Sequence, residues 1–293
     1  MLKKSTDYLK LCGAKSKLVV MEQEYNLPQT SGNIENIIKT DASINILDCK
    51  FVADNAIVKA ELCFEILYRN TDKKCETFCA SIPIEQMIDV DNAKEGCIKS
   101  VNADICSFKI KPFTDTDGEC KTVNVLAKIS FDVIALSNEK FEYVEDCYSI
   151  NNELSVDKCS AKICTVAEEI NQSHQIREVL GYDENSLCKV IDVNMNTSDI
   201  ECSFDDEQLN ISGILNVMTI TENDTGELIY IEKAIDFKHK VNANSKFNGA
   251  DVYATVDNCS YSIKSKSDLE IRAQINIGGL IYCCEQVSLM TNI

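Results

Sequence analysis

Alternation of apolar and polar side chains with a period of two constrains the fold of this chain more than any other feature. Between residues 58 and 68 the even-numbered positions are apolar, while the odd-numbered positions up to residue 65 carry Lys, Glu or Cys. The apolar members are Val58, Ala60, Leu62, Phe64, Ile66 and Tyr68. Successive side chains of a β-strand point to opposite faces, so this pattern predicts a strand with one buried face.

The same alternation recurs over residues 123–135 and 269–277. The alternating segments are separated by turn-forming residues, for example at 70–72 and 223–226. Many strands with few helical stretches predict an all-β fold of antiparallel sandwich-like or barrel-like domains. One or two short helices are expected as well. The longer would run from about residue 166 to 180 and end at a glycine, and the shorter would lie near residues 34–39.

The chain also contains an internal repeat. A shift of 153 positions lays Cys49 on Cys202 and Cys106 on Cys259, with strand and turn residues in register between them. Two tandem related domains are therefore predicted. The expected organisation is a basic N-terminal arm at 1–17, a first domain at 18–150, a linker at 151–164 and a second domain at 165–293.

The net charge limits the classes of partner. The chain has 29 basic and 47 acidic residues, which gives a net charge of −18. Nucleic acids and anionic lipids require a basic surface, so neither is expected as a partner. Residues 1–17 are a local exception, with five lysines and one aspartate. A binding arm for an acidic neighbouring copy and a solvated, disordered terminus both explain this composition.

Membrane insertion and export are not expected either. The sequence contains no apolar stretch long enough for a membrane-spanning helix. Asp7 and Lys10 interrupt the apolar run that a signal peptide would need. We therefore expect synthesis in a cytoplasm, where thiols stay reduced, and cross-linking only after a change of compartment.

Sixteen cysteines are the main functional signal. They occur without a CxxC pair and with only two histidines, whereas metal sites and catalytic thiols need partners at set spacings. Cross-linked structure is therefore the favoured interpretation. The four cysteines that recur in the repeat, Cys49, Cys106, Cys202 and Cys259, are expected in the core as small apolar side chains. The candidate cross-linking cysteines are Cys12, Cys63, Cys75, Cys79, Cys120, Cys159, Cys164, Cys283 and Cys284.

Strand periodicity places some of these thiols on the surface. If Phe64 pairs with Phe78, the hairpin sets Cys63 opposite Cys79 on the outer face, with Cys75 also outward. Spacing does not decide whether such thiols bridge within or between subunits, because disulfide geometry depends on separation in space. Cys283 and Cys284 are adjacent on a predicted strand, so they point to opposite faces and are not expected to bond to each other.

Metal sites have only weak support in the sequence. The pairs Cys75–Cys79 and Cys159–Cys164 have tolerable ligand separations, but zinc sites usually combine two close pairs in one compact structure. Residues 115–118 share part of a calcium-loop pattern but lack the first and twelfth ligands, so a polar turn is expected there. No metal ion and no other cofactor is therefore predicted.

Catalytic residues are not identified either. His174 is expected on a solvated helix face, and His239 is expected to be half-buried on a strand. No glycine-rich phosphate loop occurs, and the many carboxylates of an acidic chain are mostly surface charge. We therefore expect that this protein is not an enzyme.

Five short motifs in the first half of the chain carry a resemblance to a known family. They are Asn26-Leu27-Pro28, Ile34-Glu35-Asn36-Ile37-Ile38, Cys49-Lys50-Phe51, Glu65-Ile66-Leu67-Tyr68 and Ala80-Ser81-Ile82-Pro83-Ile84. Together they are similar to the SPOCS domain, which is found in spore-envelope and spore-morphogenesis proteins of anaerobic spore formers. The second copy resembles it less, with Ala234-Ile235-Asp236-Phe237 in place of the last motif.

The size, two-domain layout and cysteine content most resemble the cysteine-rich members of this family in the basal layer of the exosporium. The resemblance implies a structural protein of the spore surface, in the exosporium or outer coat, that is made in the mother cell. It implies self-assembly into an ordered two-dimensional lattice cross-linked by disulfides. The implied partners are copies of the chain itself, in cyclic units joined into a planar array, and other spore-envelope proteins. Two alternatives stay open, which are a coat-morphogenesis adaptor that binds another coat protein and a zinc-binding or redox protein.

Overall fold

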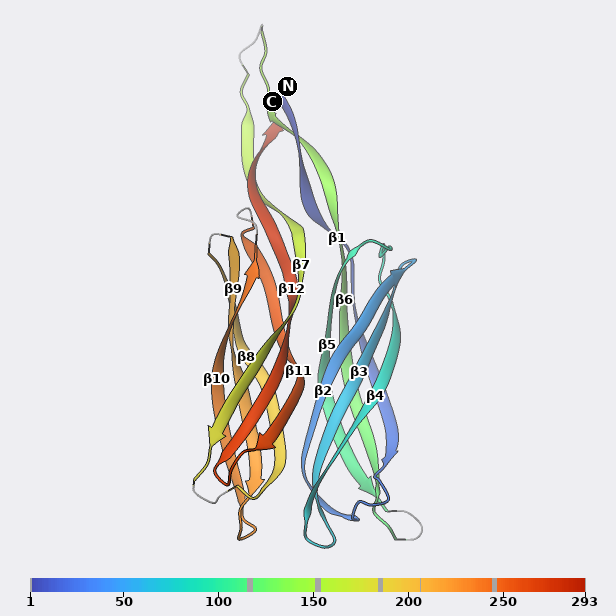
Figure 1. Ribbon diagram of the computed structural model, residues 1–293. Coiled ribbons are helices and arrows are strands. Elements are labelled where there is room, and N and C mark those ends of the chain that lie inside the picture. Colours follow the sequence, from blue (N-terminus) through green and yellow to red (C-terminus); the bar gives the residue numbers. More distant parts are fainter. Residues whose placement is uncertain are drawn as a thin grey trace. The chain divides into compact units, whose positions relative to one another are not determined.

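The computed structural model describes residues 2–114, 118–150, 154–183, 187–205, 207–243 and 247–292. Twelve β-strands in this part of the chain form four three-stranded antiparallel sheets, none of which closes into a barrel (Figure 1). The prediction of an all-β fold is therefore confirmed.

The chain divides into two compact units. We call Lys10–Ser137 the N-terminal unit, and Met1–Leu9 together with Asn138–Ile293 the C-terminal unit. The strands β1 (Leu2–Asn26) and β6 (Thr122–Asp146) each contribute residues to both units. The division therefore differs from the predicted boundaries, since residues 1–9 and 138–150 group with the second half of the chain.

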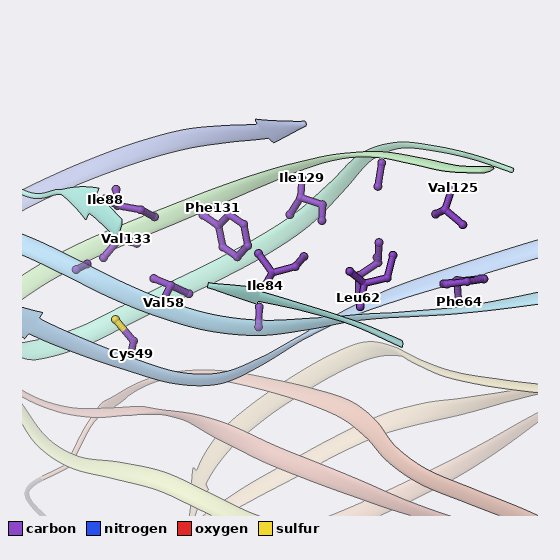
Figure 2. Close-up of a cluster of buried hydrophobic side chains, with 14 of the residues drawn as sticks. Cys49, Val58, Leu62, Phe64, Ile84, Ile88, Val125, Ile129, Phe131 and Val133 are labelled. Atoms are coloured by element: carbon purple, nitrogen blue, oxygen red, sulfur yellow. The ribbon is translucent and has the colours of Figure 1, made fainter. Parts of the chain in front are cut away.

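The N-terminal unit is a two-layer arrangement with a core between its sheets. One sheet has the order β2-β3-β4, and the other has the order β1-β6-β5. The bounds of the remaining strands are Ile34–Val52 for β2, Asn55–Asn70 for β3, Cys75–Asp89 for β4 and Ile98–Phe113 for β5. Figure 2 shows Val58 and Leu62 of β3 and Ile129 and Phe131 of β6 within one buried cluster. The predicted alternation over residues 58–68 and 123–135 produces this core, because alternate side chains of β3 and β6 are fully buried.

The C-terminal unit has the same strand order. Its sheets are β8-β9-β10 and β7-β12-β11. The bounds are Asp157–Gly181 for β7, Lys189–Asp205 for β8, Gln208–Glu222 for β9, Leu228–Asn242 for β10, Gly249–Ile263 for β11 and Asp268–Asn292 for β12. A shift of 153 positions carries the bounds of β4 onto those of β10, residue for residue. The core of this unit includes Leu209 and Leu215 of β9 and Ile271 and Ile275 of β12.

The predicted helices are wrong. Residues 166–180 lie in β7 and residues 34–39 lie in β2. Ile176 and Leu180 are four residues apart, so they share one face of a strand as readily as they share a helix face. Pairing with β12 along the length of β7 decides between the two, because the sheet takes up the backbone hydrogen bonds. No helix in the described residues is long and apolar enough to cross a membrane.

Two predicted irregular segments are also strands where they are described. Residues 2–17 of the expected arm lie in β1, which pairs with β6, so they are neither an arm nor a loose terminus. Within the expected linker, residues 157–164 begin β7, while residues 151–153 lie outside the described residues. The lysine-rich composition of β1 concealed its strand character, because its side chains are largely exposed. The polar turn expected at residues 115–118 also falls largely outside the described residues.

Candidate cross-linking sites

Cys164 of β7 and Cys284 of β12 form a disulfide, with their Cα atoms 4.0 Å apart. The two residues are directly opposite each other in the strand register and 120 positions apart in the sequence. It is the one disulfide among the described cysteines. Both residues are candidate cross-linking cysteines, and here they join two strands of one chain.

The disulfide lies at the base of a two-stranded ladder. The third strand of the sheet, β11, begins at Gly249 opposite Tyr282. From Cys283 to Asn292, β12 pairs with residues 157–165 of β7 and with no other described strand. We call these two segments the terminal ladder. Two isolated strands are marginally stable in water, so a covalent bond at this position has a clear structural role.

Two asparagine side chains satisfy backbone groups near this bond. Asn248 donates from Nδ2 to the Cys284 carbonyl at 2.6 Å and accepts from the Cys284 amide at 2.8 Å. Asn138 makes the same pair of bonds to Val166, at 2.9 and 3.3 Å. Each amide side chain therefore makes the two backbone hydrogen bonds that a residue of a neighbouring strand would make. Asn248 makes them on the β12 side of the base of the terminal ladder, and Asn138 makes them on the β7 side.

The register of the β3–β4 hairpin differs from the predicted one by two residues. Phe64 pairs with Ala80, so Cys63 lies opposite Ser81 and Cys79 lies opposite Glu65. The hairpin loop explains the shift. The Asn70 amide donates to the Lys74 carbonyl at 2.9 Å, and Lys73 adopts a left-handed φ of 67°. This three-residue loop is centred one position later than the predicted turn, and glycine, the usual residue at the left-handed position, is absent there.

None of the three thiols predicted on the outer face is fully buried. Cys79 is exposed, and Cys63 and Cys75 are half-buried. Cys63 and Cys79 share one face of the hairpin as diagonal neighbours rather than as a direct pair. The Cys79 thiol donates to the Glu65 carboxylate at 3.2 Å.

The other candidate cysteines lie at separate places. Cys12 is half-buried, with its Sγ atom 3.2 Å from the Ser137 hydroxyl. Cys120 and Cys283 are half-buried, and Cys159 is exposed on β7. The structure therefore brings together one pair of the nine candidates in a bond and places two others diagonally on one face.

The prediction that the repeated cysteines form core is wrong for three of the four. Cys49 is 7% exposed and belongs to the core of the N-terminal unit, but Cys106, Cys202 and Cys259 are exposed. Cys106 is the extra residue of a β-bulge in β5, which removes it from the alternating pattern. Cys202 and Cys259 lie on β8 and β11, and edge position alone does not explain their exposure, because the buried Cys49 also lies on an edge strand, β2.

Three cysteines were not singled out in the sequence. Cys97 and Cys147 are half-buried, and Cys188 is exposed one residue before β8. The Cys188 thiol donates a hydrogen bond to the Asp224 carboxylate. This contact joins residues 36 positions apart, so no local spacing could have indicated it.

Carboxylates and burial keep several thiols protonated. The hydrogen bond to Asp224, followed by desolvation, raises the pKa of Cys188. Desolvation is the main cause of the raised pKa values of Cys49, Cys63 and Cys202, with Glu61 adding to the effect at Cys63. The thiolate is the reactive form, so this environment suits slow disulfide formation better than thiol catalysis. In the described part of the chain, no group of three or more His, Cys, Asp or Glu residues is placed to hold a metal ion.

The two histidines lie next to each other in the C-terminal unit. His174 of β7 and His239 of β10 have ring centroids 5.5 Å apart, and the His239 Nε2 atom is 2.7 Å from Gln172 Oε1. The ring of His174 also contacts Phe237. His174 therefore lies against the other sheet and not on a solvated helix face, while His239 is half-buried on a strand as predicted.

Comparison with protein-family models matches part of the N-terminal unit. Residues 33–112 match the family model described as SipL, SPOCS domain, and this stretch spans β2 to β5 of the N-terminal unit. Neither the curated proteins nor the solved structures contain a significant match. The match supports assignment of residues 33–112 to the SPOCS family, and this domain indicates a spore-associated protein.

Proposed function

We propose that this protein is a structural subunit of the spore surface, in the exosporium or outer coat, that assembles with copies of itself into an ordered layer cross-linked by disulfides. On this proposal the assembly is a planar array of cyclic units, and the protein has no enzymatic activity. The SPOCS match of residues 33–112 supports the association with spores. The cysteine content supports the likeness to cysteine-rich proteins of the exosporium basal layer.

The position of the exposed thiols carries the proposal. All six exposed cysteines of the described residues lie on an edge strand or one residue before it. They are Cys79, Cys106, Cys159, Cys188, Cys202 and Cys259. An edge strand presents backbone groups that can pair with another chain. Association through such edges would bring thiols of neighbouring copies together.

The repeated strand order supports two tandem related domains as the building plan of the subunit. Two units with the same order of strands provide corresponding edges at two places in one chain. A subunit with more than one adhesive surface can extend an array, whereas a single self-complementary surface gives only a dimer.

The proposal is tested by electron microscopy of the purified protein together with gels run with and without reductant. We expect sheets or rings in the microscope and a ladder of covalent oligomers that reductant removes. A variant with serine at the six exposed cysteines should lose the ladder. A matched control with serine at the less accessible Cys12, Cys49, Cys63, Cys97, Cys120 and Cys147 should keep it.

Other outcomes would favour the alternatives. A soluble monomer that stays solitary at high concentration contradicts self-assembly and would favour an adaptor that binds a different coat protein. Stoichiometric zinc in the purified protein, measured by elemental analysis, would favour a metal or redox role.

A further inference from the structure

Two of the three arginines of the chain lie directly opposite each other. Arg177 of β7 pairs with Arg272 of β12 in the strand register. Like charges at directly opposed positions destabilise a sheet, so this pair needs a compensating group. Glu270, two positions along β12, supplies it.

One carboxylate binds both guanidinium groups. Arg177 donates from Nε and Nη2 to Glu270 Oε2 at 2.9 and 2.5 Å, and Arg272 donates from Nε and Nη2 to Glu270 Oε1 at 2.9 and 2.7 Å. Lys264 lies 3.4 Å from the same Oε1 atom. The side chain of Glu270 is 3% exposed, and the hydrogen bond from Arg177 is the main cause that lowers its pKa to about 2. Glu270 is therefore ionised at any physiological pH.

The cluster keeps an excess of positive charge at the surface. Three cations surround one carboxylate, which leaves a local charge of +2 on a chain whose net charge is −18. The side chains of Arg177 and Arg272 are 67% and 57% exposed. Within the described part of the chain, the bonds of these guanidinium groups use Nε and Nη2, so both Nη1 groups remain available as donors.

The buried carboxylate also fixes the orientation of the donors. A long flexible side chain normally loses rotamer freedom when it binds, and this loss weakens binding. Here Glu270 already holds both guanidinium groups, so much of their rotamer freedom is lost when the chain folds and is not lost again when a ligand binds. Guanidinium groups match carboxylates in planar geometry and are weakly hydrated, which makes them suited to such contacts.

We propose that Arg177, Arg272 and Lys264 form a docking site for carboxylates on a second copy of this chain. The inference rests on the proposed self-assembly and names one of its contacts. Charge complementarity supports this occupant, because every copy carries 47 acidic residues. The next two residue pairs along the ladder, Gln175–Gln274 and Ser173–Asn276, are uncharged. The neighbouring carboxylates of Asp257 and Asp268 accept hydrogen bonds from Gln274 and Ser265.

The sign of the charge also restricts the geometry of the contact. A two-fold symmetric contact centred on this site would place one positive cluster against another. The site must therefore meet a different surface of the neighbouring copy. Such heterologous contacts generate closed rings or open arrays rather than simple dimers.

The test compares Arg177→Gln/Arg272→Gln with a control that removes the same charge elsewhere, Lys238→Gln/Lys240→Gln on the exposed face of β10. Sedimentation over a range of protein and salt concentrations measures assembly. We expect the arginine variant to need about tenfold more protein to assemble, equivalent to about 1.4 kcal/mol, and to show a weaker dependence on salt. The control should assemble like the wild type. Equal assembly of the wild type and the arginine variant would overturn the site.

A second measurement on the monomer separates this site from the proposed function and from misfolding. Calorimetric titration of wild-type protein with a short polyglutamate peptide should show binding, and a matched polyglutamine peptide should not. The arginine variant, with its strand content checked by circular dichroism, should lose the binding. If the wild-type protein binds polyglutamate but never assembles, self-assembly is contradicted. The site would then still bind carboxylates, but those of a different acidic protein. Absence of polyglutamate binding, or tighter binding of inorganic phosphate, would overturn the carboxylate assignment.

Discussion

At the residue scale, the contact between His174 and His239 makes the C-terminal unit sensitive to acid. Desolvation lowers the pKa of both imidazoles, and the proximity of His239 lowers that of His174 further. The strand neighbours of the two rings do not offset a positive charge, since His174 is opposite Ile275 and His239 is opposite Ile211. The ion pair between Lys233 and Glu178 lies farther along the same two strands, and Lys238 and Lys240 flank His239.

We predict that the stability of the protein falls as the pH falls through about 6.5. The pKa values of both histidines are lower in the folded than in the unfolded state, so the unfolded chain takes up protons first and is favoured by acid. Urea denaturation at pH 7.5 and 5.5 should show a lower free energy of unfolding at pH 5.5. The variant His174→Gln/His239→Gln should lose most of this difference between the two pH values. A wild-type protein equally stable at both pH values would contradict the prediction.

At the element scale, the terminal ladder depends on its disulfide more than on its pairing. The ladder has two strands, and its cross-link closes a loop of 120 residues in the unfolded chain. Loop closure of this kind contributes about 2–4 kcal/mol, mainly by restricting the unfolded state.

We predict that Cys284→Ser lowers the free energy of unfolding by about 2–4 kcal/mol and speeds amide hydrogen exchange in residues 157–165 and 283–292. The neighbouring Cys283→Ser is the matched control, because it removes a thiol from the same strand and leaves the bond intact. Hydrogen exchange followed by mass spectrometry distinguishes the two. Equal protection of the terminal ladder in both variants would show that the cross-link does not stabilise it.

The sequence predicted strands better than it predicted their pairing. Alternation identified the segments within β3, β6 and β12 because their apolar faces are buried. The edge strand β7 lacks this signal, since most of its side chains are exposed, and it was mistaken for a helix. The register of β3 and β4 depends on the left-handed Lys73, a position at which lysine gives no turn signal. The equivalent loop of the second unit has Gly226 at that position, with a φ of 82°.

At the scale of the whole molecule, the first residues of the chain belong with its second half. Residues 1–9 group with the C-terminal unit, and within it Lys4 lies 2.6 Å from Glu145 while Tyr8 contacts Phe141 edge to face. The side chain of Thr6 also donates a hydrogen bond to Glu285 of the terminal ladder. These contacts contradict the expectation of a solvated arm.

We predict that deletion of residues 2–9 loosens the C-terminal unit and leaves the core of the N-terminal unit intact. Exposed ion pairs contribute little to stability, so loss of strand pairing at the end of β6 is the larger effect. Limited proteolysis should show faster cleavage within residues 138–146 and in the terminal ladder. As a control, replacing Lys3 and Lys4 by Gln should change cleavage much less. Unchanged cleavage after the deletion would support a loose arm instead.

The distribution of thiols over the molecule was also beyond sequence reasoning. Burial at the repeated positions does not follow from the order of the strands, because Cys49 on β2 and Cys202 on β8 both lie on edge strands. Cys49 and Cys202 occupy equivalent positions of the repeat, yet one is buried and the other is exposed. The repeat therefore preserves the backbone arrangement without preserving the environment of each side chain.

The carboxylates beside the thiols bear on the order of events in a layer formed as proposed. A thiol that holds its proton, as Cys188 does beside Asp224, exchanges slowly, so copies can bind, separate and bind again before any covalent bond fixes them. Misplaced subunits have time to leave during this reversible period. Alkaline conditions would shorten it by ionising the thiols, and a layer closed too quickly would retain more of its errors.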